Sequence, residues 1–169
     1  MKSLWQNMAA AAGLVAALAT AVPANAPKLT PIDVAGLKKQ IAARKGKVVL
    51  VNFWATWCGP CVKEMPDLAK LQKQYKAKGV EVITISCDDK SAQSRATEIL
   101  SKSGVGANTF INTKAENIEP YLDYMDPKAT DAGLPRTYIF DKNGKLVKSI
   151  TGESNYTSFS KALAPYVAK

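Results

Sequence analysis

The sequence predicts a single α/β domain, in which helices flank a mixed sheet with an antiparallel edge. Two runs rich in apolar, β-branched residues, 47–55 and 80–87, read as strands, and helical patterns alternate with them. Near the C-terminus, Asn143-Gly144 separates two further strands in the manner of a hairpin turn. The chain has 169 residues, of which 47% are hydrophobic. That is enough to bury one core and too apolar for a disordered chain.

The first 26 residues are typical of a secretory signal peptide. A single lysine precedes an uncharged, alanine-rich run over 8–22, and small residues follow. Cleavage is expected after Ala24 or Ala26, and residues 27–169 are expected to form the domain. The run is shorter than the ~20 residues of a membrane span, which favours a cleaved signal, with an uncleaved anchor as the alternative. No stable membrane insertion is expected after cleavage. Export would place the chain in the periplasm or another extracytoplasmic compartment, where disulfides form.

The first elements of the mature domain follow from local signals. Thr30 and Pro31 predict a helix start, since threonine is a common N-cap and proline fits the first helical position. That helix is expected to end before Gly46. Residues 47–55 are apolar at nearly every position, without a polar alternation, as expected for a strand buried on both faces in a parallel sheet. A helix should then begin near Pro60, with apolar side chains facing the core, and Gly79 should stop it.

The second strand is expected to run parallel to the first, so that both end at the same edge of the sheet. The remaining expected elements are a helix at 91–102, a short strand at 108–112, a helix at 117–125, strands at 137–141 and 146–150, and a helix at 156–167. No internal repeat or low-complexity linker interrupts them.

The cysteine and histidine content limits the kinds of catalytic and metal site that the chain can form. The chain contains three cysteines and no histidine, which excludes Ser-His and Cys-His nucleophile pairs and every His-ligated metal or haem site. A structural zinc would have to combine all three cysteines with a carboxylate, so neither a metal nor another cofactor is expected. The net charge is +9, and the lysines fall mostly on polar helix faces. This placement predicts that the lysines keep the surface solvated, or that they modestly steer acidic partners toward it. No alternation of aromatic and basic residues indicates nucleic-acid binding.

Two cysteines, Cys58 and Cys61, stand where the first buried strand turns into a helix. Three positions apart on a helical turn, their Cβ atoms lie ~5–6 Å from each other, within easy adjustment of disulfide geometry. Cys58 falls at the helix N-terminus, where unpaired N–H groups and the helix dipole stabilise a thiolate without a histidine. We therefore expect Cys58 to be the exposed nucleophile and Cys61 the resolving thiol of a redox-active disulfide.

Residues 51–61, with the letters VNFWATWCGPC, resemble the active-site segment of the thioredoxin superfamily. Residues 133–135 resemble that superfamily's cis-proline loop, and residues 141–144 its hairpin. Two details resemble the exported TlpA/ResA-type branch. Asn52 stands where thioredoxin has a buried aspartate, and residues 61–66 match the branch's Cys-x-x-Glu-x-Pro pattern.

The resemblance implies a thioredoxin-like fold over residues 27–169. An inserted strand–helix segment is expected within 88–134, before the cis-proline loop, because this stretch is longer than its counterpart in thioredoxin. Tyr121, Tyr124 and Met125 within it are expected to pack the inserted helix, with a partner-contact patch as the alternative.

The resemblance also implies how substrate binds. Pro135 would be cis and lie against the sulfur of Cys58, and the backbone of Leu134 would pair with an extended substrate segment. The other residues expected at the substrate-binding surface are Trp57, Gly59 and Pro60.

Two further side chains are candidates for the site. Glu64 lies three residues beyond Cys61 on the same helix face, and the resemblance implies that it accepts a proton near the thiol pair, with a solvated surface acid as the alternative. Cys87 ends the second strand near the same sheet edge. It is expected to be a small buried apolar residue, with a third redox thiol or an intermolecular disulfide as the alternative.

Together these features predict an exported thiol–disulfide oxidoreductase that reduces protein disulfides, of the cytochrome c maturation or copper-delivery and oxidase-assembly type. Cys58 would attack the substrate disulfide, and Cys61 would resolve the mixed disulfide. By resemblance, a membrane thiol-transporting partner would reduce the enzyme again. The alternatives are a periplasmic dithiol oxidant, a non-catalytic partner-binding module of thioredoxin-like fold, and a thiol peroxidase.

Overall fold

The structure is a computed structural model that describes residues 27–167. The strands are β1 (Thr30–Ile32), β2 (Val48–Trp54), β3 (Val80–Ser86), β4 (Thr109–Asn112), β5 (Arg136–Phe140) and β6 (Leu146–Thr151). The helices are α1 (Val34–Ala42), α2 (Gly59–Tyr75), α3 (Gln93–Ser103), α4 (Glu119–Met125) and α5 (Tyr156–Val167), with short 3-10 turns at Lys76–Lys78 and Lys90–Ala92. The expected signal peptide and its cleavage site lie outside the described residues.

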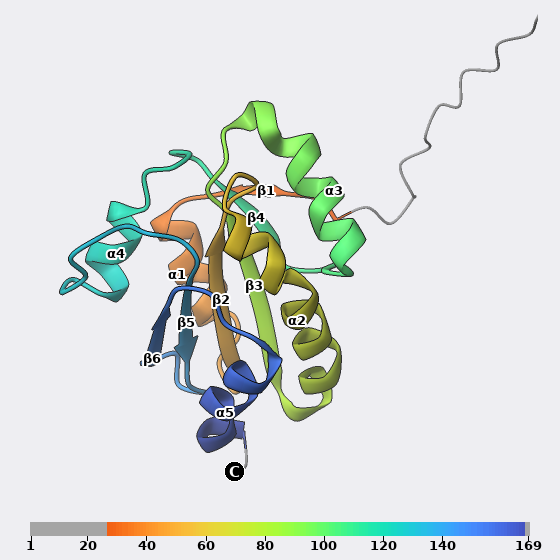
Figure 1. The fold of residues 1–169 in the computed structure, drawn as a ribbon. Helices are drawn as coiled ribbons and strands as arrows, with labels where there is room; N and C mark the ends of the chain where they lie inside the picture. The colour runs from red at the N-terminus through yellow and green to blue at the C-terminus, as the bar shows by residue number, and fades with distance from the viewer. Residues whose placement is uncertain (1–26, 168–169) are drawn as a thin grey trace, which may run out of the picture.

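One six-stranded sheet, in the order β1-β4-β3-β2-β5-β6, runs through the molecule (Figure 1). Strand β2 lies in its interior, with all seven residues buried, parallel to β3 on one side and antiparallel to β5 on the other. Strands β5 and β6 form the antiparallel hairpin around residues 141–144. The predicted α/β class, with a mixed sheet and an antiparallel edge, is therefore confirmed.

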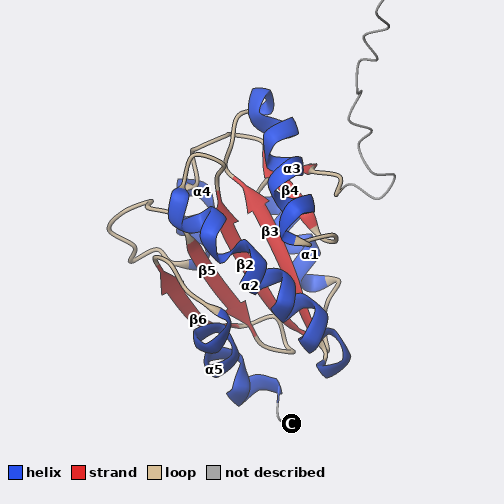
Figure 2. Ribbon diagram, turned by 45° about the vertical axis from the view of Figure 1, so that its right-hand side comes forward, coloured by secondary structure: helices blue, strands red, loops and turns tan. Residues whose placement is uncertain are grey.

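Helices cover the sheet in two layers. Helix α2 packs against α3 and α5, and α1 packs against α4; Figure 2 shows α2 lying across the front of the sheet. The largest fully buried side chains are Trp54, Tyr121, Tyr138, Phe53, Phe159, Leu37, Leu50, Met65, Leu68, Leu71, Ile83 and Ile85. Within residues 27–167, no helix combines the length and apolarity that crossing a membrane requires.

The expected helix start at Thr30 is wrong, because residues 30–32 form the edge strand β1, which pairs with β4. Pro31 is compatible with this position, since an edge strand tolerates a residue without an N–H. The helix begins after Asp33 instead, whose side chain accepts the backbone N–H of Gly36 at 2.7 Å. The cap is therefore an aspartate, another favoured N-cap residue, three positions later than predicted.

The expected inserted strand–helix segment is present as β4 and α4. Strand β4 lies between β1 and β3, parallel to both. Tyr121 and Met125 are buried, and the hydroxyl of Tyr121 donates to the carbonyl of Ile32 at 2.8 Å. Tyr124 is 37% exposed, with the Nζ of Lys38 4.3 Å from its ring centroid. The predicted packing role is therefore confirmed for Tyr121 and Met125, whereas Tyr124 lies at the surface.

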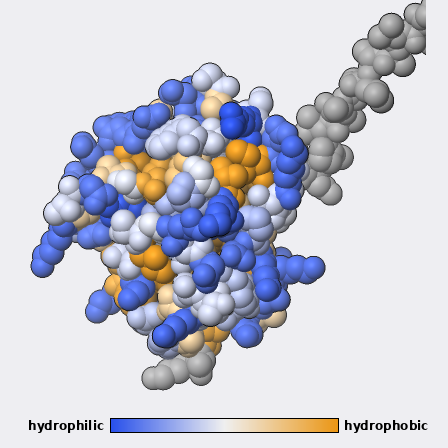
Figure 3. All heavy atoms as spheres, in the orientation of Figure 1, coloured by the Kyte–Doolittle hydropathy of each residue, from blue (hydrophilic) through white to orange (hydrophobic). Residues whose placement is uncertain are grey.

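The topology brings the chemistry-bearing segments to one edge of the sheet. The C-terminal ends of β2 and β3 lie side by side, and the backbone N–H of Cys87 donates to the carbonyl of Trp54 at 2.7 Å. The antiparallel β5 begins at this edge, where Arg136 pairs with Phe53. Hydrophobic side chains reach the surface in the upper half of the face that Figure 3 shows, at the level where β2 ends in Figure 1.

Candidate active site

The two cysteines of the motif lie at the start of α2 and are joined by a disulfide, with their Cα atoms 5.2 Å apart. Cys58 is the N-cap residue of the helix, and the backbone N–H of Cys61 donates to its sulfur at 3.3 Å. Pro60 occupies the first turn, where its missing N–H leaves no helical bond unmade. One N–H of this helix end therefore points at the Cys58 sulfur, which is the arrangement that stabilises a thiolate there.

The two sulfurs differ in access. Cys58 is 7% exposed and Cys61 is fully buried. The expectation that Cys58 is exposed is wrong for this disulfide form, because its sulfur is bonded to the buried Cys61 and packed at the helix end. Cys58 is nevertheless the cysteine of the pair that reaches the surface. The neighbours predicted to contact substrate are open to solvent: Trp57 is 59% exposed, and Gly59 and Pro60 are also exposed.

Glu64 is a buried carboxylate on the first turns of α2, only 1% exposed. Its Oε1 accepts from the Nδ2 of Asn52 at 2.7 Å, and its Oε2 accepts from the backbone N–H of Ser154 at 3.0 Å. Burial raises the pKa of Glu64 to about 7, although these two hydrogen bonds oppose the rise. The alternative of a solvated surface acid is therefore wrong, and Glu64 is able to exchange a proton near neutral pH.

Asn52 connects Glu64 to the sheet. Its Nδ2 also donates to the hydroxyl of Thr137 at 3.0 Å, while its own Oδ1 is buried without a partner among the described residues. A half-turn of the amide would offer Oδ1 to a protonated Glu64, so Asn52 suits both protonation states of its neighbour. An aspartate here would instead compete with Glu64 for one proton.

The cis-proline loop lies where the resemblance places it along the chain. The peptide bond between Leu134 and Pro135 is cis. Because Arg136 pairs with Phe53, Pro135 lies at the β2 end that leads into the cysteine motif. The carbonyl of Pro135 accepts the backbone N–H of Gly152 at 3.0 Å, Pro135 is buried, and Leu134 is half-buried.

Cys87 is fully buried, and burial raises the pKa of its thiol well above its ordinary range. Its sulfur lies 3.9 Å from the carbonyl oxygen of Ile85. A protonated thiol without access to solvent is a poor nucleophile, so the structure favours the small buried residue over a third redox thiol.

A buried aspartate that the sequence reading missed ties the cysteine motif to β3. Asp88 is 1% exposed and accepts the backbone N–H of Thr56 at 3.0 Å with each of its oxygens. It also accepts the hydroxyls of Thr56 and Ser86, each at 2.7 Å. Only its position at the end of a buried strand, beside the site edge, signals this role in the sequence.

Replacing Asp88 with alanine is expected to lower the free energy of unfolding by about 3 kcal/mol, since it leaves three buried donors unpaired. Urea unfolding of the oxidised protein at constant pH measures this. The matched control is Asp89→Ala, because Asp89 is exposed and its side chain makes no capping bond. The control should change stability by at most about 0.5 kcal/mol. Equal losses in the two variants would show that the Asp88 bonds do not hold the motif.

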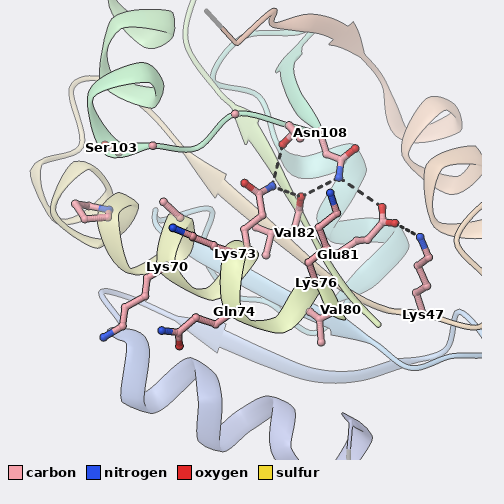
Figure 4. A pocket seen from close by; sticks show the side chains of 16 residues that line it. Lys47, Lys70, Lys73, Gln74, Lys76, Val80, Glu81, Val82, Ser103 and Asn108 are labelled. Atoms are coloured by element: carbon pink, nitrogen blue, oxygen red, sulfur yellow. Dashed lines mark hydrogen bonds and ion pairs between the residues drawn. The ribbon is translucent and has the colours of Figure 1, made fainter. Parts of the chain in front are cut away.

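Two hollows lie near α2. The one beside the cysteine pair measures about 610 Å³ and is lined by Thr56, Val62, Ser94, Arg95, Glu98, Ile99 and Lys102. The other is a groove of about 1090 Å³ between α2, the start of β3 and residues 103–108 (Figure 4). Lysines dominate its charged lining, and one of them, Lys47, pairs with Glu81. None of the predicted site residues lines this groove.

Comparison with sequence families supports the same chemistry. The family model described as Redoxin matches residues 20–164. The chain is 36% identical over 140 residues to a "Thiol-disulfide oxidoreductase ResA" of Bacillus cereus, covering 76% of this chain and 69% of that protein. The protein of the same name from Bacillus subtilis (strain 168) is 32% identical over 132 residues, covering 76% of this chain and 66% of that protein.

Solved structures share the fold. A thiol:disulfide interchange protein of the thioredoxin family from Chlorobium tepidum TLS has a TM-score of 0.61 at 26% identity, over 75% of this chain and 83% of that one. A putative thiol:disulfide interchange protein DsbE from Chlorobium tepidum has a TM-score of 0.56 at 27% identity, over 76% of this chain and 82% of that one.

Proposed function

This chain belongs to the Redoxin family and is a ResA-type thiol–disulfide oxidoreductase of the thioredoxin superfamily, and from this premise we propose that it reduces protein disulfides outside the cytoplasm. The signal-peptide pattern of residues 1–26 supports the export. The proposed substrates are the haem-site cysteines of apocytochrome c, or copper-delivery proteins for oxidase assembly. The proposed electron donor is a membrane thiol-transporting protein.

The observation that carries the proposal is the asymmetry of the cysteine pair, with Cys58 at the surface end of α2 and Cys61 buried. In the reduced enzyme, the Cys58 thiolate attacks one sulfur of the substrate disulfide. An enzyme–substrate disulfide forms, and the other substrate sulfur leaves as a thiolate that takes up a proton. The helix N-terminus stabilises the attacking thiolate and so replaces the absent histidine.

Resolution of the mixed disulfide is the step that we assign to Cys61 and Glu64. Glu64 takes the proton of the Cys61 thiol, and the thiolate attacks the Cys58 sulfur. The enzyme disulfide forms, and the second substrate sulfur leaves and is protonated. One turn of helix separates the two residues, and a carboxyl with a pKa of about 7 is matched to this transfer near neutral pH. Two electrons have then passed from the enzyme to the substrate.

Substrate is proposed to bind across the cis-proline loop. The backbone of Leu134 pairs with an extended substrate segment, and Pro135 holds the substrate cysteine against Cys58. Exposed Trp57 supplies an aromatic contact beside the reacting sulfur. The hollow that borders Thr56 and Val62 provides room for a neighbouring substrate side chain.

Equilibration with reduced and oxidised glutathione tests the direction of electron flow. A reductant should have a potential near the ~−270 mV of thioredoxin, not near the ~−120 mV of a strong oxidant such as DsbA. The motif favours the reductant, since Gly59-Pro60 places no histidine between the cysteines. A Cys87→Ala control restricts the titration to the motif pair. A potential above about −150 mV would reject the reductant and favour a dithiol oxidant.

A further inference from the structure

Arg136 is a buried cation directly after the cis-proline. It begins β5 and is only 3% exposed. Arginine side chains are rarely so buried unless their charge and donors are matched, so its partners identify its task.

Most of those partners lie in the loop that leads to the proline, while the hydroxyl of Tyr138 on β5 also interacts with the guanidinium. The Nε of Arg136 donates to the carbonyl of Gly133 at 3.1 Å. One terminal nitrogen donates to the carbonyl of Asp131 at 2.6 Å and to its Oδ1 at 2.7 Å. The other lies 3.8 Å from Oδ2 of Asp126. The planar guanidinium therefore fixes two backbone carbonyls and neutralises two carboxylates at once.

The loop is tightened further around Asp131. Its Oδ1 also accepts the backbone N–H of Gly133 at 2.8 Å. A Cβ on Gly133 would lie 3.0 Å from that same oxygen. The side chain of Asp131 therefore lies directly against Gly133, and the backbone before Leu134 is held by Arg136 and Asp131 together.

Leu134 is consequently anchored on both sides. Gly133 is held by Arg136, and Pro135 is held by the N–H of Gly152. Among the hydrogen bonds within residues 27–167, none uses the N–H or the carbonyl of Leu134. These are the two groups that an added strand would pair with.

We propose that Arg136 is a positioning residue that holds the free backbone groups of Leu134 in place for an extended polypeptide, and so favours protein disulfides over small ones. This inference rests on the proposed function and specifies its substrate class. A small disulfide exchanges at Cys58 without needing a strand partner, whereas a disulfide within an extended chain gains both backbone hydrogen bonds.

The test compares two disulfide substrates of the reduced enzyme. The probes are an extended peptide carrying an intramolecular disulfide, and 5,5′-dithiobis(2-nitrobenzoate), which offers no peptide backbone. Arg136→Lys keeps the positive charge but loses the planar guanidinium that binds the carbonyls of Gly133 and Asp131 together. We expect its rate constant for the peptide to fall about 10-fold, which corresponds to about 1.4 kcal/mol. Its rate constant for the small probe should change less than about 2-fold, because the chemistry at Cys58 is the same.

A second variant keeps the test decisive if Arg136→Lys does not fold. Asp131→Ala removes a partner of both Arg136 and Gly133 and should show the same selective loss. Its matched control is Asp123→Ala, which removes an exposed carboxylate from the same acidic region without touching Arg136. The control should leave both rate constants unchanged.

Three outcomes would overturn the inference: equal losses with both probes, no loss with either, or a changed reduction potential in Arg136→Lys. The last would mean that the arginine acts on the thiol pair and not on substrate alignment. The proposed function fails separately, through a wild-type potential that is too oxidising, and the ratio of the two rate constants does not depend on that potential.

Discussion

A Cys61→Ser protein is expected to accumulate mixed disulfides through Cys58, whereas a Cys58→Ser protein is expected to form none. Both variants should lose disulfide reductase activity by about 10³-fold or more, since each step of the exchange needs its own thiol. The reason for the difference lies in access, because only Cys58 reaches the surface. Non-reducing electrophoresis of the variants from their own host, followed by mass spectrometry of the captured proteins, measures it and names the substrates.

The third cysteine provides the control for this experiment. Cys87 is buried and its thiol is held protonated, so Cys87→Ala should leave both the activity and the adduct pattern unchanged. Adducts that persist in a Cys58→Ser/Cys61→Ser protein would contradict the assignment and point to Cys87. Full activity of Cys58→Ser would instead favour a partner-binding module over an enzyme.

Much of the fold could be predicted because its signals are local. The apolar run of β2, the glycine stop at Gly79 and the hairpin turn at Gly144 each act within a few residues, and all three match the structure. The terminal helix occupies its predicted range. The cysteine pair is predictable for the same reason, since both sulfurs belong to one helical turn.

What could not be predicted depends on contacts between distant segments. Thr30-Pro31 satisfies the rules for a helix start as well as those for an edge strand, and pairing with β4 decides between them. Asp88 and Ser154 are ordinary polar residues in the sequence. Their roles follow only when β3 and the β6–α5 loop meet the cysteine motif and Glu64.

The ionisation of Glu64 is expected to make the stability of the folded protein strongly dependent on pH. In the folded protein its pKa is about 7, against an ordinary value of 4.5. Between these values the folded protein holds a proton that the unfolded chain has released, so stability falls as the pH rises from about 4.5 to 7 and is constant above. The loss reaches about 3 kcal/mol. Glu64→Gln cannot titrate, so its unfolding free energy should lack this slope.

Urea unfolding of the oxidised proteins between pH 5 and 8 measures the slope. Two acids serve as controls. Glu98→Gln, an exposed acid on α3, should keep the wild-type slope. Glu153→Gln should move its midpoint to lower pH, because the charge of Glu153 helps to raise the pKa of Glu64. An unchanged slope in Glu64→Gln would assign the titration to another group.

The rate at which the mixed disulfide is resolved shows whether Glu64 accepts a proton or is only a buried acid. If Glu64 takes the Cys61 proton, Glu64→Gln should slow resolution of the mixed disulfide about 10²-fold at pH 7. The deficit should shrink at alkaline pH, where hydroxide removes the proton instead. The rate of Cys58 attack on a small disulfide should change little, because that step precedes the transfer. A variant that loses the stability slope but keeps the wild-type resolution rate would make Glu64 a structural acid, and the proton would then leave through another route.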